Sequence, residues 1–213
     1  DLNVLELYIV TVSDEDDNPL HRQARITISG LLIKTKVQTG EHTIALVNDA
    51  RYDQFSNEPW SIASAPNLKV EELFDGTMIN MIYHNNEWIL STRSDIGLNN
   101  KWSTKSFKQL FKECSTIDYD KLNKEYTYSF VMRHKKHRIT SKVETNELVL
   151  VEVYHGSQQL NELPENNGYR IIRLQNDIVG LQKGLTYYKD NVRYKWLTTE
   201  HKFIEMIKPN TNN

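Results

Sequence analysis

The spacing of apolar and polar positions along the chain predicts a protein made mostly of strands. Residues 4–12 alternate between apolar and polar side chains, and so do residues 78–83, as expected for strands with one buried face. The same reasoning predicts further strands at 26–35, 42–48, 87–93, 126–132, 148–154 and from Tyr169 onward. Asn85 and Asn86 separate two of these strands, which predicts a short hairpin turn.

Two segments have helical spacing instead. Four side chains recur at three- and four-residue intervals over 105–114: Phe107, Leu110, Phe111 and Cys114. Ser103 is the predicted N-cap of this helix, and Thr198 or Thr199 is predicted to cap a final helix over 200–208. Strands with two or three helices packed on them predict an α+β fold with antiparallel sheets.

Length and composition are those of an ordinary globular domain. The chain has 213 residues, of which 38% are hydrophobic and 25% charged, so it is long enough to bury a substantial core. We expect a single domain over 1–213. No apolar run is long enough for a transmembrane helix, and the first residues do not read as a signal peptide. A start at Asp1 suggests a processed product or a fragment.

Cysteine content and net charge restrict the expected compartment and the expected class of partner. Cys114 is the single cysteine, which excludes an internal disulfide and predicts an intracellular, reducing compartment. The net charge is -2, whereas proteins dedicated to non-specific nucleic-acid binding usually carry a basic excess. A local basic face is compatible with this balance.

The segment Leu-Phe-Asp-Gly-Thr at 73–77 stands directly before the strand at 78–83. It resembles motif I of the covalent nucleotidyltransferases, the superfamily of RNA ligases, DNA ligases and mRNA capping enzymes, which reads Lys-x-Asp/Glu-Gly. In that family the lysine amine attacks the α-phosphate of a nucleoside triphosphate. Leu73 occupies the lysine position here, and a hydrocarbon side chain has no lone pair with which to form the covalent intermediate.

Other segments follow in the order that this family requires. The segment at 29–33 is similar to an Arg-Gly-hydrophobic strand of the family, and 52–58 is similar to its Lys-Phe-Phe-Asn segment. The segment at 91–94 is similar to the one that follows motif I, 126–131 to motif III, and 193–196 to motif V. The resemblance, which spans about 29–208, implies an ATP-grasp-like ligase domain of the phage or giant-virus RNA ligase type. It also implies that the C-terminal appendage domain of such ligases is absent or truncated.

The same alignment of motifs shows where catalytic groups are missing. Ser29, Gln54 and Val131 stand where the family has a phosphate-binding arginine, a lysine and the motif III glutamate, and 177–180 offers no clean motif IV. Adenylyl transfer needs a nucleophile, metal-binding carboxylates and cations that balance the triphosphate. The resemblance therefore implies no catalytic residue, no metal, no cofactor, and a vestigial nucleotide site: Asp75, Gly76, Arg93, Arg193 and Lys195.

Two alternatives stay open. The first is an active RNA ligase that uses ATP and Mg²⁺ with a non-standard or mutated nucleophile. Lys69 could supply an amine, but the four extended residues that separate it from position 73 span roughly 13 Å. The second is an α+β interaction module in which Asp75-Gly76 is a chance turn signature.

The strongest charge cluster lies at 133–138, in the predicted turn between two strands. As candidate contacts to a nucleic-acid backbone it offers Arg133, Lys135, Lys136 and Arg138. The alternative interpretation is a solvated turn. His134 and His137 also lie in this turn without a nearby carboxylate, so we expect no metal site there. Trp196, next to Lys195, is the tryptophan best placed to stack on a base.

These observations favour a catalytically degenerate, RNA-ligase-like nucleotidyltransferase domain that serves as a structural or binding component. The resemblance suggests a role in a viral particle or a nucleoprotein assembly. We expect protein partners in an assembly, with nucleic acid as the other candidate partner and no membrane.

Overall fold

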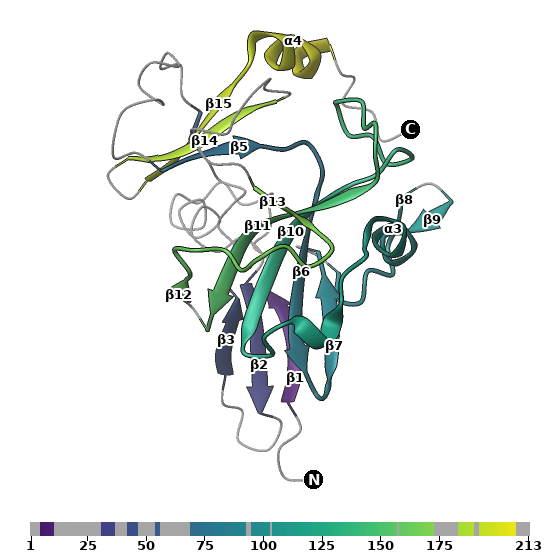
Figure 1. Ribbon diagram of the computed structural model, residues 1–213, viewed down its shortest axis with the longest axis vertical. Coiled ribbons are helices and arrows are strands. Elements are labelled where there is room, and N and C mark those ends of the chain that lie inside the picture. Colours follow the sequence, from purple (N-terminus) through teal and green to yellow (C-terminus); the bar gives the residue numbers. More distant parts are fainter. Residues whose placement is uncertain are drawn as a thin grey trace.

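A computed structural model describes most of the chain from residue 69 onward and four strands before it. The described residues are 5–10, 31–36, 42–46, 54–55, 69–92, 95–102, 104–156, 158–172, 183–189 and 192–207. Within them the strands form four sheets, nearly all antiparallel, and two α-helices accompany them (Figure 1). The predicted α+β class is confirmed at this level.

Two small sheets lie outside the central part of the fold. The first has three antiparallel strands, β1 (Leu5–Val10), β2 (Leu31–Lys36) and β3 (His42–Leu46), in that order. The second is a ribbon of β8 (Lys101–Trp102) and β9 (Lys105–Ser106). The strands predicted at 4–12, 26–35 and 42–48 are confirmed over 5–10, 31–35 and 42–46, and their other residues lie outside the described ranges.

The central sheet has six strands, in the order β12-β11-β10-β6-β7 with β13 beside β11. Their bounds are β6 (Thr77–His84), β7 (Glu87–Ser91), β10 (Tyr126–Arg133), β11 (Glu147–His155), β12 (Gln158–Gln159) and β13 (Arg170–Ile171). Only β13 runs parallel to its neighbour in this sheet. The predicted hairpin is confirmed: Asn85 and Asn86 join β6 to β7 with φ values of 48° and 63°.

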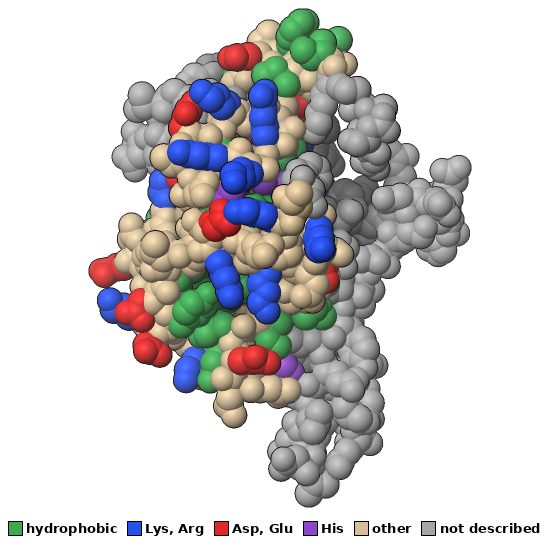
Figure 2. All heavy atoms as spheres, turned by 90° about the vertical axis from the view of Figure 1, so that its right-hand side faces the viewer, with side chains coloured by type: hydrophobic (Ala, Val, Ile, Leu, Met, Phe, Trp, Pro, Cys, Tyr) green, Lys and Arg blue, Asp and Glu red, His purple; other side chains and the backbone are tan. Residues whose placement is uncertain are grey.

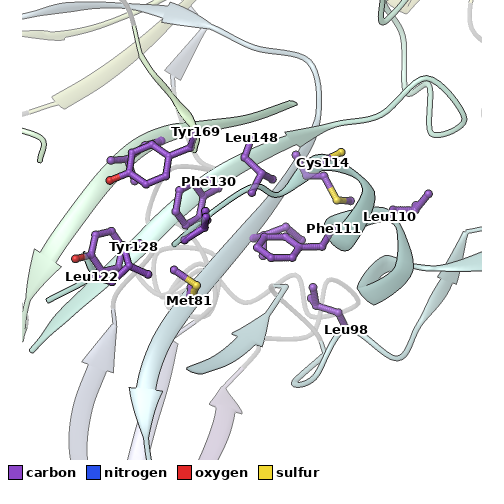
Figure 3. Close-up of a cluster of buried hydrophobic side chains, with 14 of the residues drawn as sticks. Met81, Leu98, Leu110, Phe111, Cys114, Leu122, Tyr128, Phe130, Leu148 and Tyr169 are labelled. Atoms are coloured by element: carbon purple, nitrogen blue, oxygen red, sulfur yellow. The ribbon is translucent and has the colours of Figure 1, made fainter. Parts of the chain in front are cut away.

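One face of the central sheet packs against helix α3 (Phe107–Cys114). Figure 3 shows Phe111 reaching from α3 toward the strands that carry Met81 and Phe130. A 3-10 turn, η1 (Tyr119–Lys121), follows α3 before the chain enters β10. Because this apolar face and the helix cover each other, they form the main hydrophobic core.

The predicted N-cap of α3 was wrong. Ser106 caps the helix: its Oγ accepts a hydrogen bond from the Gln109 N–H at 3.2 Å, and the Gln109 side chain accepts one from the Ser106 N–H at 3.0 Å. This reciprocal pair is a capping box. Lys105 and Ser106 belong to β9, so the helix starts two residues later than its apolar spacing predicted.

The second large sheet has four strands, β4 (Gln54–Phe55), β5 (Val70–Leu73), β14 (Gly184–Lys189) and β15 (Val192–Leu197). Their order is β4-β15-β14-β5, with β4 parallel to β15. Sequence patterning did not predict β5. In Figure 1 this sheet and α4 (Thr199–Ile207) lie at the end of the molecule opposite β1–β3.

Helix α4 begins as predicted. The Thr198 Oγ1 accepts a hydrogen bond from the His201 N–H at 3.2 Å, which satisfies a free donor of the first turn. His201 is fully buried, whereas Phe203, Met206 and Ile207 are 61%, 83% and 62% exposed, so these three apolar side chains point outward. Within the described part of the chain, no helix combines the length and apolarity needed to cross a membrane.

Candidate functional site

The two large sheets meet where β5 runs into β6 through residues 74–76. Phe74 packs there against aliphatic side chains of the central sheet, among them Val131 and Val149. The segment that resembles motif I therefore forms the junction between the sheets. Its residues are held by both of them.

Strand alternation gives the four-stranded sheet a mainly apolar face, which also carries the buried Glu72, and an opposite face that we call the polar face, although it also carries Leu73 and Leu197. Residues that pair across strands point to the same face, and successive residues of one strand point to opposite faces. The apolar face carries a packed cluster: Val70, Leu185, Tyr187, Tyr194 and Trp196. Trp196, the candidate for base stacking, therefore lies on the face opposite Lys195.

The polar face carries two positions of the ligase-like pattern. Leu73 of β5 pairs with Gly184 of β14. Glu71 pairs with Thr186, and Thr186 pairs with Lys195 of β15. Because neighbouring strands lie about 4.8 Å apart, the backbone of Lys195 is roughly 10 Å from that of Glu71. Positions 73 and 195, far apart in the sequence, thus share one face of one sheet.

The structure does not place the arginine side chains of the expected nucleotide site beside positions 73 and 195. Arg93 lies outside the described residues. Arg193 occupies a register position in β15 opposite Tyr188, but its side chain is not among those described. Lys195 is half-buried on the polar face, and Asp75 lies at the junction instead.

The Asp75 carboxylate is enclosed and held by fixed groups. It is 4% exposed. Its Oδ2 accepts hydrogen bonds from the backbone N–H groups of Thr140 and Ser141, each at 2.7 Å. Its Oδ1 lies 3.3 Å from the Nζ of Lys183. Asp75 thereby ties β5 to the loop between β10 and β11 and to the start of β14.

The electrostatics of Asp75 follow from these contacts. Burial alone would raise the pKa of the carboxyl, but the two backbone N–H groups and the Lys183 ammonium favour the charged form and outweigh burial. The pKa of Asp75 therefore lies below its ordinary value. A charged carboxylate with both oxygens engaged has little capacity left for a nucleotide or a metal ion.

Gly76 has a packing role beside Asp75. A Cβ at this position would come within 2.6 Å of the Met132 carbonyl oxygen and 2.5 Å of Val131 Cγ1. The carbonyl belongs to the β10 ladder and cannot move away freely. Glycine is therefore needed here for the close approach of the junction to β10, independently of any nucleotide.

A second carboxylate, Glu71, lies at a cavity on the polar face. Glu71 is 2% exposed, and its Oε1 lies 2.7 Å from the Nζ of Lys69, a side chain that is 42% exposed. Both residues line a cavity of about 270 Å³, together with residues 160–163 and the two isoleucines of 171–172. This cavity is a concave site beside the motif I region.

The four basic candidates in the hairpin after β10 fall into two groups. Arg133 is 5% exposed, forms an ion pair with Glu147, and places its guanidinium 5.6 Å from the centre of the Phe74 ring. Its charge is therefore used inside the fold. Lys135, Lys136 and Arg138 are exposed to solvent.

The two histidines of this hairpin are also part of the fold. His134 Nε2 lies 2.8 Å from Glu113 Oε2, a carboxylate on α3 that local sequence patterns did not place near this hairpin. His137 Nε2 lies 2.6 Å from the Thr77 hydroxyl, and burial, followed by nearby His134, lowers its pKa. No three His, Cys, Asp or Glu side chains form a metal-binding group within the ranges that the structure places.

Helix α3 adds two exposed lysines next to the hairpin. We call the exposed side chains of Lys108, Lys112, Lys135, Lys136 and Arg138 the basic surface. The nearby Glu113 carboxylate contacts Lys105 and His134. Figure 2 shows Lys and Arg side chains spread over the face that carries α3, from just below an apolar patch at the top to the lower half, with some Asp and Glu side chains among them.

Sequence reasoning missed two residues that define these sites. Glu71 stands between apolar Val70 and the Glu72-Leu73 pair, and an acidic residue inside a short strand is a signal that could have been followed. Lys183 gave no such signal, because it stands just before β14 in a polar segment. Its partner Asp75 is 108 residues away in the sequence.

We compared the chain with known proteins in two ways. A scan against models of protein families found no match, and a search of curated proteins found none either.

Proposed function

We propose that this chain is a non-catalytic, RNA-ligase-like domain that acts as a binding or structural component of a larger assembly. The family assignment rests on the ordered sequence segments around motif I. The observation that carries the loss of catalysis is the state of Asp75. Its carboxylate is buried and held by Thr140, Ser141 and Lys183, so it stabilises the fold.

Position 73 supports the same conclusion. Leu73 is a half-buried residue of β5, paired with Gly184, and its side chain offers no nucleophilic atom. The polar face near it carries the buried carboxylate of Glu71, which would repel the phosphates of a nucleotide. Both features are unfavourable for transfer of AMP to this site.

Helix α4 supports a role in an assembly. Its outward face is formed by Phe203, Met206 and Ile207, which are spaced three and four residues apart. An apolar helix face of this kind can fit the groove of a protein partner. Protein contact through α4 is the form of assembly that we propose first.

One observation favours the alternative of an active ligase. Lys69 lines the cavity and directly precedes β5, so an amine is present in this region. Intact-mass spectrometry after incubation with ATP and Mg²⁺, beside a competent ligase as control, separates the two functions. We expect an unchanged mass. An added AMP that disappears in Lys69→Arg would establish the active ligase and overturn our proposal.

Nucleic acid is a second candidate partner, favoured by the basic surface. Its side chains come from two elements, α3 and the hairpin after β10, that Glu113 and His134 join. Contacts between lysines and phosphates release counterions, so such binding should weaken steeply as salt rises.

Fluorescence anisotropy with a labelled single-stranded RNA tests this candidate. The double variant Lys135→Glu/Lys136→Glu should lose binding about tenfold or more, and the loss should be greatest at low salt. The matched control is Lys121→Glu/Lys124→Glu, which makes the same charge change at exposed lysines near η1. Equal losses in both variants would show that only net charge matters and would remove the basic surface as a site.

A further inference from the structure

The cavity beside β5 has the composition of a small ligand site. Four aliphatic side chains form its apolar wall: Leu160, Leu163, Ile171 and Ile172. Its polar side carries Lys69, Glu71, Asn161 and Glu162. A volume of about 270 Å³ lies just below the range of roughly 300–1,000 Å³ typical of drug-sized ligands, so the site suits a small molecule.

Glu71 is the deepest charged group of this cavity. Its side chain is 3% exposed, whereas that of its partner Lys69 is 42% exposed. A buried carboxylate needs a cationic or hydrogen-bonding partner, because burial removes its hydration. When the half-exposed Lys69 side chain swings out into solvent, it regains water and rotational freedom.

A buried hydroxyl group lies next to Glu71 in the sheet. Thr186 pairs with Glu71 across β5 and β14 and is 1% exposed. Its Oγ1 has no hydrogen-bond partner in the described part of the chain. Buried polar atoms are normally satisfied, so this side of the sheet has unused hydrogen-bonding capacity.

The charges of the cavity select the sign of a ligand. Glu71 and Glu162 contribute two formal negative charges and Lys69 contributes one positive charge, which leaves a net charge of −1. An anionic group such as a phosphate or carboxylate would lie next to the Glu71 carboxylate, and the lining residues offer it no cation besides Lys69. A ligand cation would meet a carboxylate that is already shielded from water, where charge-assisted hydrogen bonds are strong.

We propose that this cavity binds a small amphipathic cation. The ammonium group of the ligand contacts the Glu71 carboxylate, and its hydrocarbon body packs against the aliphatic wall formed by residues 160–163 and 171–172. Lys69 is the resident cation that the ligand displaces into solvent. The proposal does not rest on the ligase resemblance, because it uses only the cavity and its charges.

This arrangement predicts opposite effects of two neighbouring substitutions. Glu71→Gln removes the anion and should weaken binding of a cation about tenfold, a typical loss for a hydrogen bond to a charged group. Lys69→Gln removes the competing ammonium and should strengthen binding several-fold. A matched control is Lys142→Gln, which removes an exposed lysine paired with Glu144 in the loop between β10 and β11.

The test is an NMR titration of the full chain with three probes of one shape. Benzylammonium should bind in a saturable manner and at least about tenfold more tightly than benzyl alcohol, with benzoate weakest. Circular dichroism checks that each variant is folded, and the Lys69→Gln result stands by itself if Glu71→Gln is not folded.

Several results would overturn the proposal. They are benzoate binding as tightly as benzylammonium, the absence of saturable binding, or weaker binding of benzylammonium by Lys69→Gln. An unchanged affinity in folded Glu71→Gln would do the same. These outcomes are separate from the AMP-adduct experiment, which tests the ligase-like function and leaves the cavity untouched.

Discussion

Asp75 and Glu71 lie four residues apart, and both carboxylates are almost fully buried, yet they are held in different ways. Asp75 binds two backbone N–H groups, which cannot leave without distorting the fold, and the largely buried Lys183. Glu71 binds the half-exposed ammonium of Lys69 at the edge of a cavity. Burial alone therefore does not distinguish the two carboxylates, whereas the exposure of their partners does.

Removal of the Asp75 carboxylate should have the largest effect on stability. Asp75→Ala leaves the Lys183 ammonium and the N–H groups of Thr140 and Ser141 without their acceptor. We expect the free energy of unfolding to fall by about 3–5 kcal/mol, as for other broken buried ion pairs. Urea unfolding at neutral pH measures this loss. A loss below about 1 kcal/mol would mean that Asp75 is not a structural group.

A methyl group at Gly76 should have the next largest effect. Gly76→Ala pushes a Cβ against the Met132 carbonyl, which the β10 ladder holds in place. We expect a loss of about 1–3 kcal/mol, the usual range for overpacking. Gly156→Ala serves as a comparison, because its added Cβ meets no atom within 4 Å, although its φ of 60° adds backbone strain. Thermal unfolding of both variants measures the two losses. If Gly76→Ala is no less stable than Gly156→Ala, the close approach of Gly76 to β10 is contradicted.

Low pH should reduce the stabilisation of the fold by Asp75. Since its pKa in the folded protein lies below the ordinary value of 3.8, the stabilisation by Asp75 is complete above that value and disappears as the pH falls through the folded pKa. The difference in unfolding free energy between wild type and Asp75→Ala should therefore narrow below about pH 4. Urea titrations across this range measure the difference, and one that stays constant would show that the carboxylate charge plays no part.

The smallest effect is expected at Glu71. Glu71→Gln breaks an ion pair whose lysine is 42% exposed, so solvent already weakens the attraction. We expect a change in unfolding free energy below about 1 kcal/mol, measured in the same urea experiments. A loss as large as that of Asp75→Ala would erase the contrast between the two carboxylates and make Glu71 a second structural group.

Local patterns in the sequence were sufficient for much of the fold. The β6–β7 hairpin could be predicted because alternating strands flank two asparagines, a residue type that tolerates positive φ. The cap of α4 at Thr198 could be predicted for a similar reason. Each of these signals lies within a few neighbouring residues, where sequence reasoning is strongest.

The candidate sites depend on contacts that no local pattern contains. The partners of Asp75 lie 65, 66 and 108 residues away along the chain. Arg133 belongs to a basic run typical of a solvated turn, but Glu147 draws it into the interior. The β5 strand was missed because two adjacent acidic residues interrupt its apolar pattern, and pairing with β14 overrides that local signal.

The most direct test of lost catalysis restores the missing nucleophile. Leu73→Lys places an amine at the motif I position, and intact-mass spectrometry after incubation with ATP and Mg²⁺ reports any transfer of AMP. We predict an unchanged mass for the folded variant, beside a competent ligase that becomes labelled, because Asp75 remains held by Thr140, Ser141 and Lys183. An AMP adduct on the introduced lysine would contradict this and show a working nucleotide site that lacks only its nucleophile.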